Sequence, residues 1–298
     1  MSKTVAWIRA FRLRTLPLSL SGIIVGSSCA LAQGNWNTSI FILAVLTTLF
    51  FQILSNLAND LGDSLKGADN EHRVGPMRSV QSGLISVSEM KLAVFLFIIL
   101  SIGSAIPLIL IGVKDLPTSI LYAYFGLTIA AILAAITYTV GKRAYGYSGF
   151  GDLFVFIFFG GVSVLGVYPL FSKSFDEQLV LLSLTVGFLS VAVLNLNNMR
   201  DQENDTAVGK RTLVVKIGFK AAKIYHSILI LGAMCSLLMY SLQNNPYYLL
   251  SAIPFFVLIP HLIKVWNTTV PKDLDPELKK VALGTFAISL IFLIVSLI

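Results

Sequence analysis

A succession of long apolar segments constrains the fold of this chain more than any other feature. Nine such segments recur along its 298 residues. A helix of about 20 residues crosses a hydrocarbon core about 30 Å thick. Because backbone groups cannot stay unpaired in lipid, and the segments are too long and too uniformly apolar for barrel strands, we expect helices. The predicted spans are 16–33, 38–58, 90–112, 118–139, 150–171, 178–198, 221–243, 247–266 and 279–298.

The composition agrees with a membrane protein. Hydrophobic residues make up 56% of the chain and charged residues 12%, whereas an average soluble domain is about 25% charged. These values exclude an ordinary soluble globule and a disordered chain. We predict an all-α integral membrane protein of nine transmembrane helices that forms one domain over residues 1–298.

The basic residues predict the topology. The net charge of +7 would raise the question of nucleic acid in a soluble protein. Here 20 of the 22 Lys and Arg fall in one set of alternate loops, and only Lys114 and Lys173 fall in the other. Since cytoplasmic loops carry the excess of basic residues, the N-terminus is predicted in the cytoplasm and the C-terminus outside.

Acidic residues gather in two long loops on the predicted cytoplasmic side, about 59–89 and 199–220. Each loop begins at the end of a predicted helix, the second and the sixth. The four-helix interval between them suggests two related four-helix halves followed by a ninth helix. The two loops hold eight of the 15 carboxylates: Asp60, Asp63, Asp69, Glu71, Glu89, Asp201, Glu203 and Asp205.

The spacing within these clusters puts oxygen ligands on one helix face. Asn56 precedes Asp60 by four residues and Asp63 follows three later, while Asn197, Asp201 and Asp205 are four apart. Residues three or four apart share a face, so we expect each half to present a strip of carboxylates and amides toward one point. Carboxylates that share one face repel each other unless a cation lies between them. Carboxylate and amide oxygens suit Mg²⁺, which usually keeps phosphate oxygens as further ligands.

Basic residues follow both clusters, namely Arg73 and Arg78 in the first and Lys210 and Arg211 in the second. Arg and Lys are the usual partners of phosphate groups, so a diphosphate is the expected third partner of the metal. For each residue singly, a positive-inside role explains the charge equally well. The acids taken alone also fit solvated helix ends, but two matching clusters on corresponding helices favour a site.

Four polar segments then identify a family resemblance. They read RLRTLPLSLSGIIVG from Arg12, NLANDLGDSLKGADNEHRVGPMRSVQSG from Asn56, TYTVGKRAYGYSGFGDLFVFIFFG from Thr137 and LNLNNMRDQENDTAVGKRTLVVKIG from Leu194. In this order they resemble the UbiA superfamily of intramembrane prenyltransferases. The details are similar to the branch that prenylates 1,4-dihydroxy-2-naphthoate in menaquinone synthesis. The superfamily commonly reads NDxxDxxxD, whereas Gly67 stands here at the last acidic position and Asp69 follows, a spacing typical of that branch.

The resemblance implies a role for each matching residue. It implies that Mg²⁺ ions bridge the acid clusters to the diphosphate of a polyprenyl donor, and that Tyr138 lies near the reacting allylic carbon. The acceptor, 1,4-dihydroxy-2-naphthoate, would lose CO₂ on prenylation. The implied metal ligands are Asn56, Asn59, Asp60, Asp63, Asn198, Asp201 and Asp205, while Asp69 either contacts the metal or shapes the loop. The implied diphosphate ligands are Lys142, Arg73, Lys210 and Arg143, and the nearby basic residues Arg78 and Arg211 are further candidates. Candidates to bind the acceptor are Arg12, Asn195, Tyr145 and Tyr147.

The prenyl tail needs an apolar path, for which Phe154, Phe156, Phe158 and Phe159 are candidates, although packing or lipid contact explains each phenylalanine as well. Gly160, Gly161 and Gly187, together with Gly22 and Gly26, are expected to allow close helix packing.

Two other kinds of function remain open from the residues alone. A secondary transporter also suits nine spans in two halves, but transporters place binding groups near the bilayer midplane, whereas nearly every ionisable residue here lies at the end of a span. A membrane anchor or scaffold leaves the paired acids unexplained. Within the enzymes, a different aromatic acceptor is the alternative.

Overall fold

The computed structural model of the protein describes residues 2–70, 74, 75 and 77–298, and within these ranges the chain is helical with connecting loops. Nine segments of the described chain are long and apolar enough to cross a membrane, which confirms the predicted spans. They are Lys3–Ala32, Thr38–Leu65, Val87–Gly112, Thr118–Thr137, Gly151–Ser172, Leu179–Arg200, Phe219–Gln243, Pro246–Asn267 and Pro271–Val295.

Six of these segments are single helices or nearly so. They are α3 (Thr38–Leu65), α4 (Val87–Gly112), α5 (Thr118–Thr137), α8 (Leu179–Arg200), α11 (Phe219–Gln243) and α13 (Asp275–Val295), the last preceded by the short turn η5 (Pro271–Leu274). Ser86 and Glu89 form a capping box that fixes the start of α4, because each side chain bonds the other residue's backbone N–H.

The first segment is broken into two helices. The helix α1 (Lys3–Phe11) ends at Arg12, whose backbone is left-handed with φ of 50°, and the turn η1 (Leu13–Thr15) leads into α2 (Leu16–Ala32). Only α2 corresponds to the predicted span 16–33. The break directs the Arg12 side chain toward the end of α3, where it meets Asp60.

The fifth segment is also irregular. It consists of α6 (Gly151–Val155), the π-helix η3 (Phe156–Leu165) and α7 (Tyr168–Ser172). A Cβ at Gly160 would lie 2.6 Å from the Ser183 carbonyl oxygen, so η3 and α8 approach closely there as expected. Gly161 was expected to do the same and does not, since nothing lies within 4 Å of its Cβ position.

Short helices lie in the connections between the spans. They are η2 (Tyr145–Ser148), α9 (Gln202–Ala207) and α10 (Leu213–Ile217), while η4 (Pro246–Ala252) and α12 (Phe255–Asn267) complete the eighth segment. The helix α3 continues two turns past the predicted end at 58, so Asp60 and Asp63 lie on a helix rather than in a loop. Asp205 likewise lies on α9.

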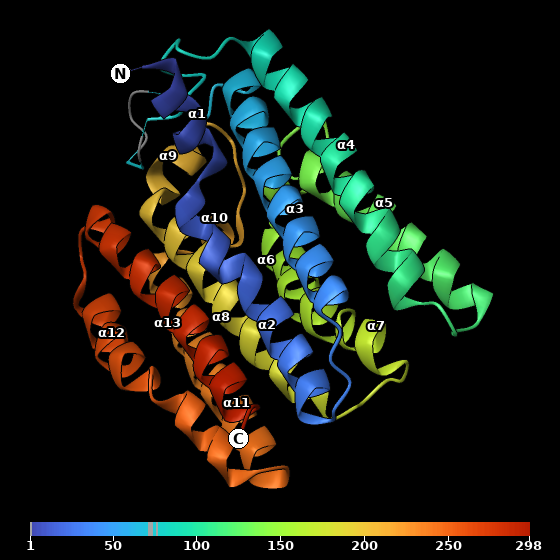
Figure 1. Ribbon diagram of the computed structural model, residues 1–298. Helices are drawn as coiled ribbons and strands as arrows, with labels where there is room; N and C mark the ends of the chain where they lie inside the picture. Colours follow the sequence, from blue (N-terminus) through green and yellow to red (C-terminus); the bar gives the residue numbers. More distant parts are fainter. Residues whose placement is uncertain (1, 71–73, 76) are drawn as a thin grey trace.

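The core has two parts that meet around one interior space. The larger part joins α2, α8, α11, α13 and η3, and the smaller joins α1, α3 and α4. The helix of the ninth span, α13, packs against both α2 and α8. The helix α2 belongs to the first predicted half and α8 to the second. In Figure 1 the N-terminus lies at the same end of the bundle as α9, and the C-terminus lies at the other end.

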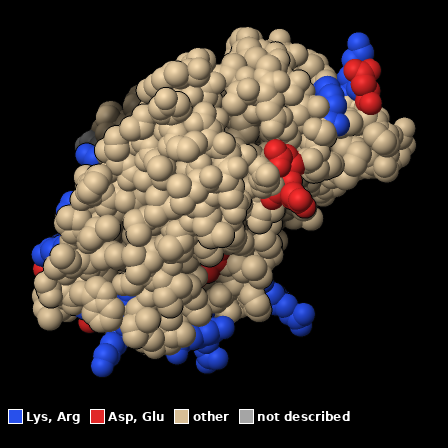
Figure 2. All heavy atoms as spheres, turned by 90° about the horizontal axis from the view of Figure 1, so that it is seen from below, with Lys and Arg blue, Asp and Glu red and all other residues tan. Residues whose placement is uncertain are grey.

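The face of the molecule seen in Figure 2 is largely uncharged. Figure 2, which views the molecule from below Figure 1, shows broad areas with neither basic nor acidic side chains, and the charged groups lie mainly toward the margins. Large apolar side chains such as Phe95, Ile129 and Phe256 are exposed on α4, α5 and α12. A surface of this kind is suited to lipid contact.

Candidate active site

A cavity of about 580 Å³ lies between the helices, and both acid clusters reach one end of it. Asn59 and Asp63 come from α3, Asp201 and Asp205 from the end of α8 and from α9, and all four line the cavity. The rest of the wall is mostly apolar and is supplied by α2, α3, α5, η3 and α13. The two clusters, predicted from sequence to converge, therefore share one cavity end.

Asp60 is held by two arginines beside this end. Its carboxylate is 1% exposed and pairs with Arg12, while Nη1 of Arg78 lies 3.3 Å from Oδ1. Nε of Arg78 also lies 3.7 Å from Oδ1 of the buried Asp69. Arg12 and Arg78 line the cavity, but Asp60 and Asp69 lie behind them. The two arginines therefore separate these acids from the cavity.

Asp63 has a different set of partners. The hydroxyl of Tyr147 donates to Asp63 Oδ1 at 2.9 Å, and Lys210 Nζ lies 3.9 Å from Asp63 Oδ2 and 3.7 Å from Asp205 Oδ1. With its amide oxygen toward Arg12, Asn59 donates to Asp63 Oδ2 at 3.0 Å. Lys210 thus bridges the acids of the two clusters.

Their surroundings keep two partners of Asp63, Lys210 and Tyr147, protonated. Burial disfavours the ammonium of Lys210, but Asp63 and Asp205 outweigh burial, so the pKa of Lys210 lies above its ordinary value. Burial and then the Asp63 charge raise the pKa of the Tyr147 phenol. Lys210 therefore stays a cation and Tyr147 a hydrogen-bond donor at neutral pH.

Asp201 is held by Arg200, a residue that the sequence analysis missed. Arg200 is 2% exposed. Its Nε and Nη2 donate to the two oxygens of Asp201 at 2.9 and 2.6 Å, and its Nη1 donates to Asp275 at 2.5 Å. Asp275 begins α13 and lines the cavity. An arginine at the end of an apolar helix, directly before an acid, was the signal available in the sequence.

The donor atoms at the cavity end fit a divalent cation that prefers oxygen. In the described part of the chain, no three acidic, histidine or cysteine side chains already converge as a metal site. The amide oxygen of Asn204 is nevertheless buried without a hydrogen-bond partner, and this residue lines the cavity beside Asp201 and Asp205. Carboxylate and amide oxygens facing one space are the ligands that Mg²⁺ accepts.

The remaining predicted residues divide between the cavity and other places. Asn56, Tyr138 and Tyr145 line the cavity, and the Tyr145 hydroxyl donates to the Ala134 carbonyl. Lys142, Arg143 and Arg211 are exposed and lie outside the lining, as does Tyr147. Arg73 lies outside the described residues.

Two asparagines on α8 face away from the cavity. Asn195 is fully buried and donates to the Ala222 carbonyl at 3.0 Å, and the buried Asn198 does not line the cavity either. Asn197 lines it instead and accepts a hydrogen bond from Arg200 Nη2 at 2.9 Å. Asn197 stands four residues before Asp201, and this spacing was the sequence signal that the two side chains share a helix face.

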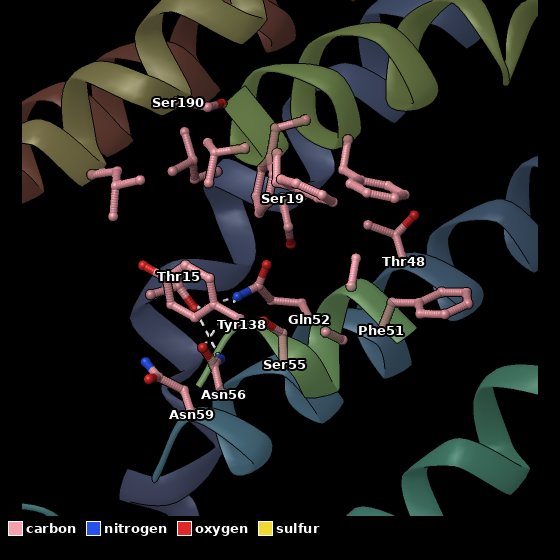
Figure 3. A pocket seen from close by; sticks show the side chains of 18 of the residues that line it. Thr15, Ser19, Thr48, Phe51, Gln52, Ser55, Asn56, Asn59, Tyr138 and Ser190 are labelled. Carbon is pink, nitrogen blue, oxygen red and sulfur yellow. Dashed lines mark hydrogen bonds between the residues drawn. The ribbon is translucent and has the colours of Figure 1, made fainter. Parts of the chain in front are cut away.

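Three of the four phenylalanines expected to form the path for the prenyl tail line the cavity. Phe154, Phe158 and Phe159 line the cavity, whereas Phe156 packs on Phe188, with ring centroids 5.3 Å apart. Polar residues of η1, α2 and α3 face the same space and were not predicted. Figure 3 shows Thr15, Ser19, Thr48, Gln52 and Ser55 with Asn56 around it.

Comparison with known proteins gives full-length matches. The profile of the UbiA prenyltransferase family matches residues 19–293. The 1,4-dihydroxy-2-naphthoate octaprenyltransferase of Haemophilus influenzae is 40% identical, over 97% of this chain and 95% of that protein. The Escherichia coli protein of the same name is 38% identical, over 99% and 96%. A solved structure, a UbiA homolog from Archaeoglobus fulgidus bound to GPP and Mg²⁺, has a TM-score of 0.60 at 18% identity, over 97% and 99%.

Proposed function

The chain belongs to the UbiA prenyltransferase family, and on that premise we propose that it prenylates 1,4-dihydroxy-2-naphthoate from a polyprenyl diphosphate. Diphosphate and CO₂ leave, and the product is demethylmenaquinol, a precursor of menaquinone. The two similar bacterial proteins named above carry this acceptor in their names. The observation that supports the proposal best is the meeting of two acid clusters, from corresponding helices, at one end of a largely apolar cavity.

The end of the cavity that both acid clusters reach, here called the acid end, suits the diphosphate. Asp63, Asp201, Asp205 and the Asn204 oxygen would hold Mg²⁺, which when bound supplies positive charge where the leaving group becomes negative. Lys210 and Arg78 line the same end as permanent cations. Preorganised positive groups of this kind lower the barrier to loss of diphosphate, because the charge that they meet develops in the transition state.

The apolar body of the cavity suits the other half of the donor. Phe154, Phe158 and Phe159 offer apolar surface to an isoprenoid chain. Tyr138 lines the cavity near the acids and can stabilise an allylic cation with its ring face. Exclusion of water by these side chains protects that cation until the aromatic acceptor attacks it.

The location follows from the substrates and the charge distribution. We place the protein as a multi-pass protein of the cytoplasmic, or inner, membrane, with the acid end of the bundle facing the cytoplasm. The excess of Lys and Arg in the loops at that end supports this orientation.

The decisive experiment is an assay of the purified protein in detergent, with 1,4-dihydroxy-2-naphthoate and a short prenyl diphosphate, with Mg²⁺ or with EDTA. We expect a prenylated product that has lost CO₂, detected by mass, only with Mg²⁺. Turnover of another aromatic acid or phenol instead would overturn the assigned acceptor. Absence of product with every acceptor would overturn the proposed function.

A further inference from the structure

One wall of the cavity is polar deep inside an otherwise apolar bundle. Along α3 the residues Thr48, Gln52, Ser55 and Asn56 face the cavity, at helical spacings of three and four, and Thr15 joins them from the turn before α2. Phenylalanines of α6 and η3 form another part of the cavity wall. A ligand in the cavity can meet polar groups on one edge and aromatic surface on its face.

Hydrogen bonds fix the orientation of the Asn56 amide. Its nitrogen donates to the Phe11 carbonyl oxygen at 3.0 Å and to Thr15 Oγ1 at 3.2 Å. Because a backbone carbonyl can only accept, the nitrogen must face Phe11 and the Asn56 oxygen must face the other way, toward Gln52.

The orientation of the Gln52 amide follows from that of Asn56. Gln52 Nε2 donates to Asn56 Oδ1 at 3.2 Å and to Thr15 Oγ1 at 3.4 Å. Both of its N–H groups are therefore used, and turning the amide over would set two acceptors against each other. The Gln52 oxygen accepts no hydrogen bond from the described chain. In Figure 3 it points away from Thr15 and Asn56.

From this geometry we propose that Gln52 determines acceptor specificity by receiving a hydrogen bond from a ring hydroxyl of the aromatic acceptor. The inference rests on the proposed function, because it names the contact that such an acceptor makes in this cavity. A fixed carbonyl-type acceptor requires a donor from the ligand, and a phenolic hydroxyl is the donor that a dihydroxy-naphthoate carries. When this cavity-facing oxygen is left without that donor in a largely apolar cavity, analogues that lack the hydroxyl are disfavoured.

The test pairs a protein change with a substrate change. Wild type and Gln52→Met are assayed with 1,4-dihydroxy-2-naphthoate and with the two analogues that each lack one ring hydroxyl. The quantity compared is the ratio of kcat/KM for the naphthoate to kcat/KM for each analogue. In the wild type we expect this ratio to be about ten or more for the analogue that lacks one particular hydroxyl. In Gln52→Met we expect the same ratio to approach one. The KM for the prenyl diphosphate stays unchanged, and fluorescence titration of the naphthoate without Mg²⁺ or donor shows the same loss of preference in binding.

The control is Thr128→Val, which removes a hydroxyl that α5 contributes to the wall of the same cavity. Thr128 already donates to the Tyr124 carbonyl of its own helix at 2.9 Å, so we expect Thr128→Val to keep the wild-type ratio of kcat/KM values.

A second variant covers the case in which Gln52→Met does not fold. Thr15→Val removes one acceptor of the Gln52 amide, and we expect it to lower the preference for the hydroxylated acceptor by a smaller factor. An unchanged ratio in the Gln52 or Thr15 variant, with the wild type active on the naphthoate, overturns the inference and leaves the proposed function intact. A wild type inactive on the naphthoate overturns the proposed function instead.

Discussion

At the scale of single residues, the acids of the two clusters differ in what surrounds them. Asp60 is paired with Arg12 and Arg78 behind the cavity wall, whereas Asp63 and Asp205 line the cavity and share Lys210. An acid already neutralised by two arginines positions those arginines, while one that faces the cavity can add a metal. The structure therefore favours unequal roles within a motif whose sequence looks uniform.

Asp63→Asn is expected to lower kcat by about 10² or more, because it removes one charge from the group that would hold Mg²⁺ against the leaving diphosphate. The fold should persist, since the amide has the same size and its oxygen still accepts from Tyr147. Product formation by mass and thermal unfolding in detergent measure the two effects. Asp115→Asn, in the loop between α4 and α5, is the control and should keep full activity. Full activity of Asp63→Asn would contradict the metal assignment.

Arg200 is expected to position Asp201. Arg200→Lys keeps the charge but loses the bidentate contact with Asp201. The Mg²⁺ concentration for half-maximal activity should therefore rise several-fold, with little change in unfolding temperature. Arg200→Met leaves a buried carboxylate unpaired and should cost about 3–5 kcal/mol of stability without Mg²⁺. A lysine variant with unaltered Mg²⁺ dependence would show that Arg200 serves packing alone.

At the scale of elements, α3 brings its acids to the cavity by a close approach to the segment after α5. A Cβ at Gly62 would lie 2.4 Å from Thr139 Oγ1 and 2.6 Å from the Thr139 carbonyl carbon. Thr139 Oγ1 also donates to the Ala58 carbonyl at 3.1 Å. A glycine between Asp60 and Asp63 thus lets the helix end lie against the Thr139 backbone.

Gly62→Ala is expected to destabilise the protein by about 1–3 kcal/mol and to lower activity, because the backbone of Thr139 cannot move aside without shifting the acids. Thermal unfolding and turnover measure both effects. Gly103→Ala on α4 is the matched control, since nothing lies within 4 Å of its Cβ position. There alanine should be neutral or stabilising, by up to about 1 kcal/mol. Equal unfolding temperatures for the two variants would rule out the close approach.

At the scale of the whole molecule, the ninth helix joins the two halves. Packed on α2 and α8, α13 contributes Asp275, Leu278 and Ala282 to the cavity wall. The site is therefore closed by a helix that belongs to neither acid cluster. The nine spans found in the described residues place the termini at opposite ends of the bundle, and the charge distribution predicts which end faces the cytoplasm.

Cysteine labelling in intact cells tests that orientation. In a Cys235→Ser background, a membrane-impermeant maleimide should label Lys114→Cys directly, because the loop between α4 and α5 is predicted to lie outside. Lys272→Cys, just before α13, should be labelled only after the membrane is permeabilised. The reverse pattern would invert the proposed topology.

The sequence by itself determined the nine spans and the meeting of the two acid clusters. Apolar length sets the spans because lipid demands it, and residues spaced three or four apart must share a helix face. Only the tertiary structure decided which side chains face the cavity and what they touch. Asp63 with Tyr147 and Arg200 with Asp275 are pairs 84 and 75 residues apart. Asn197 and Asn198 are neighbours with different surroundings. Such contacts depend on how helices rotate and pack against each other, which no local spacing fixes.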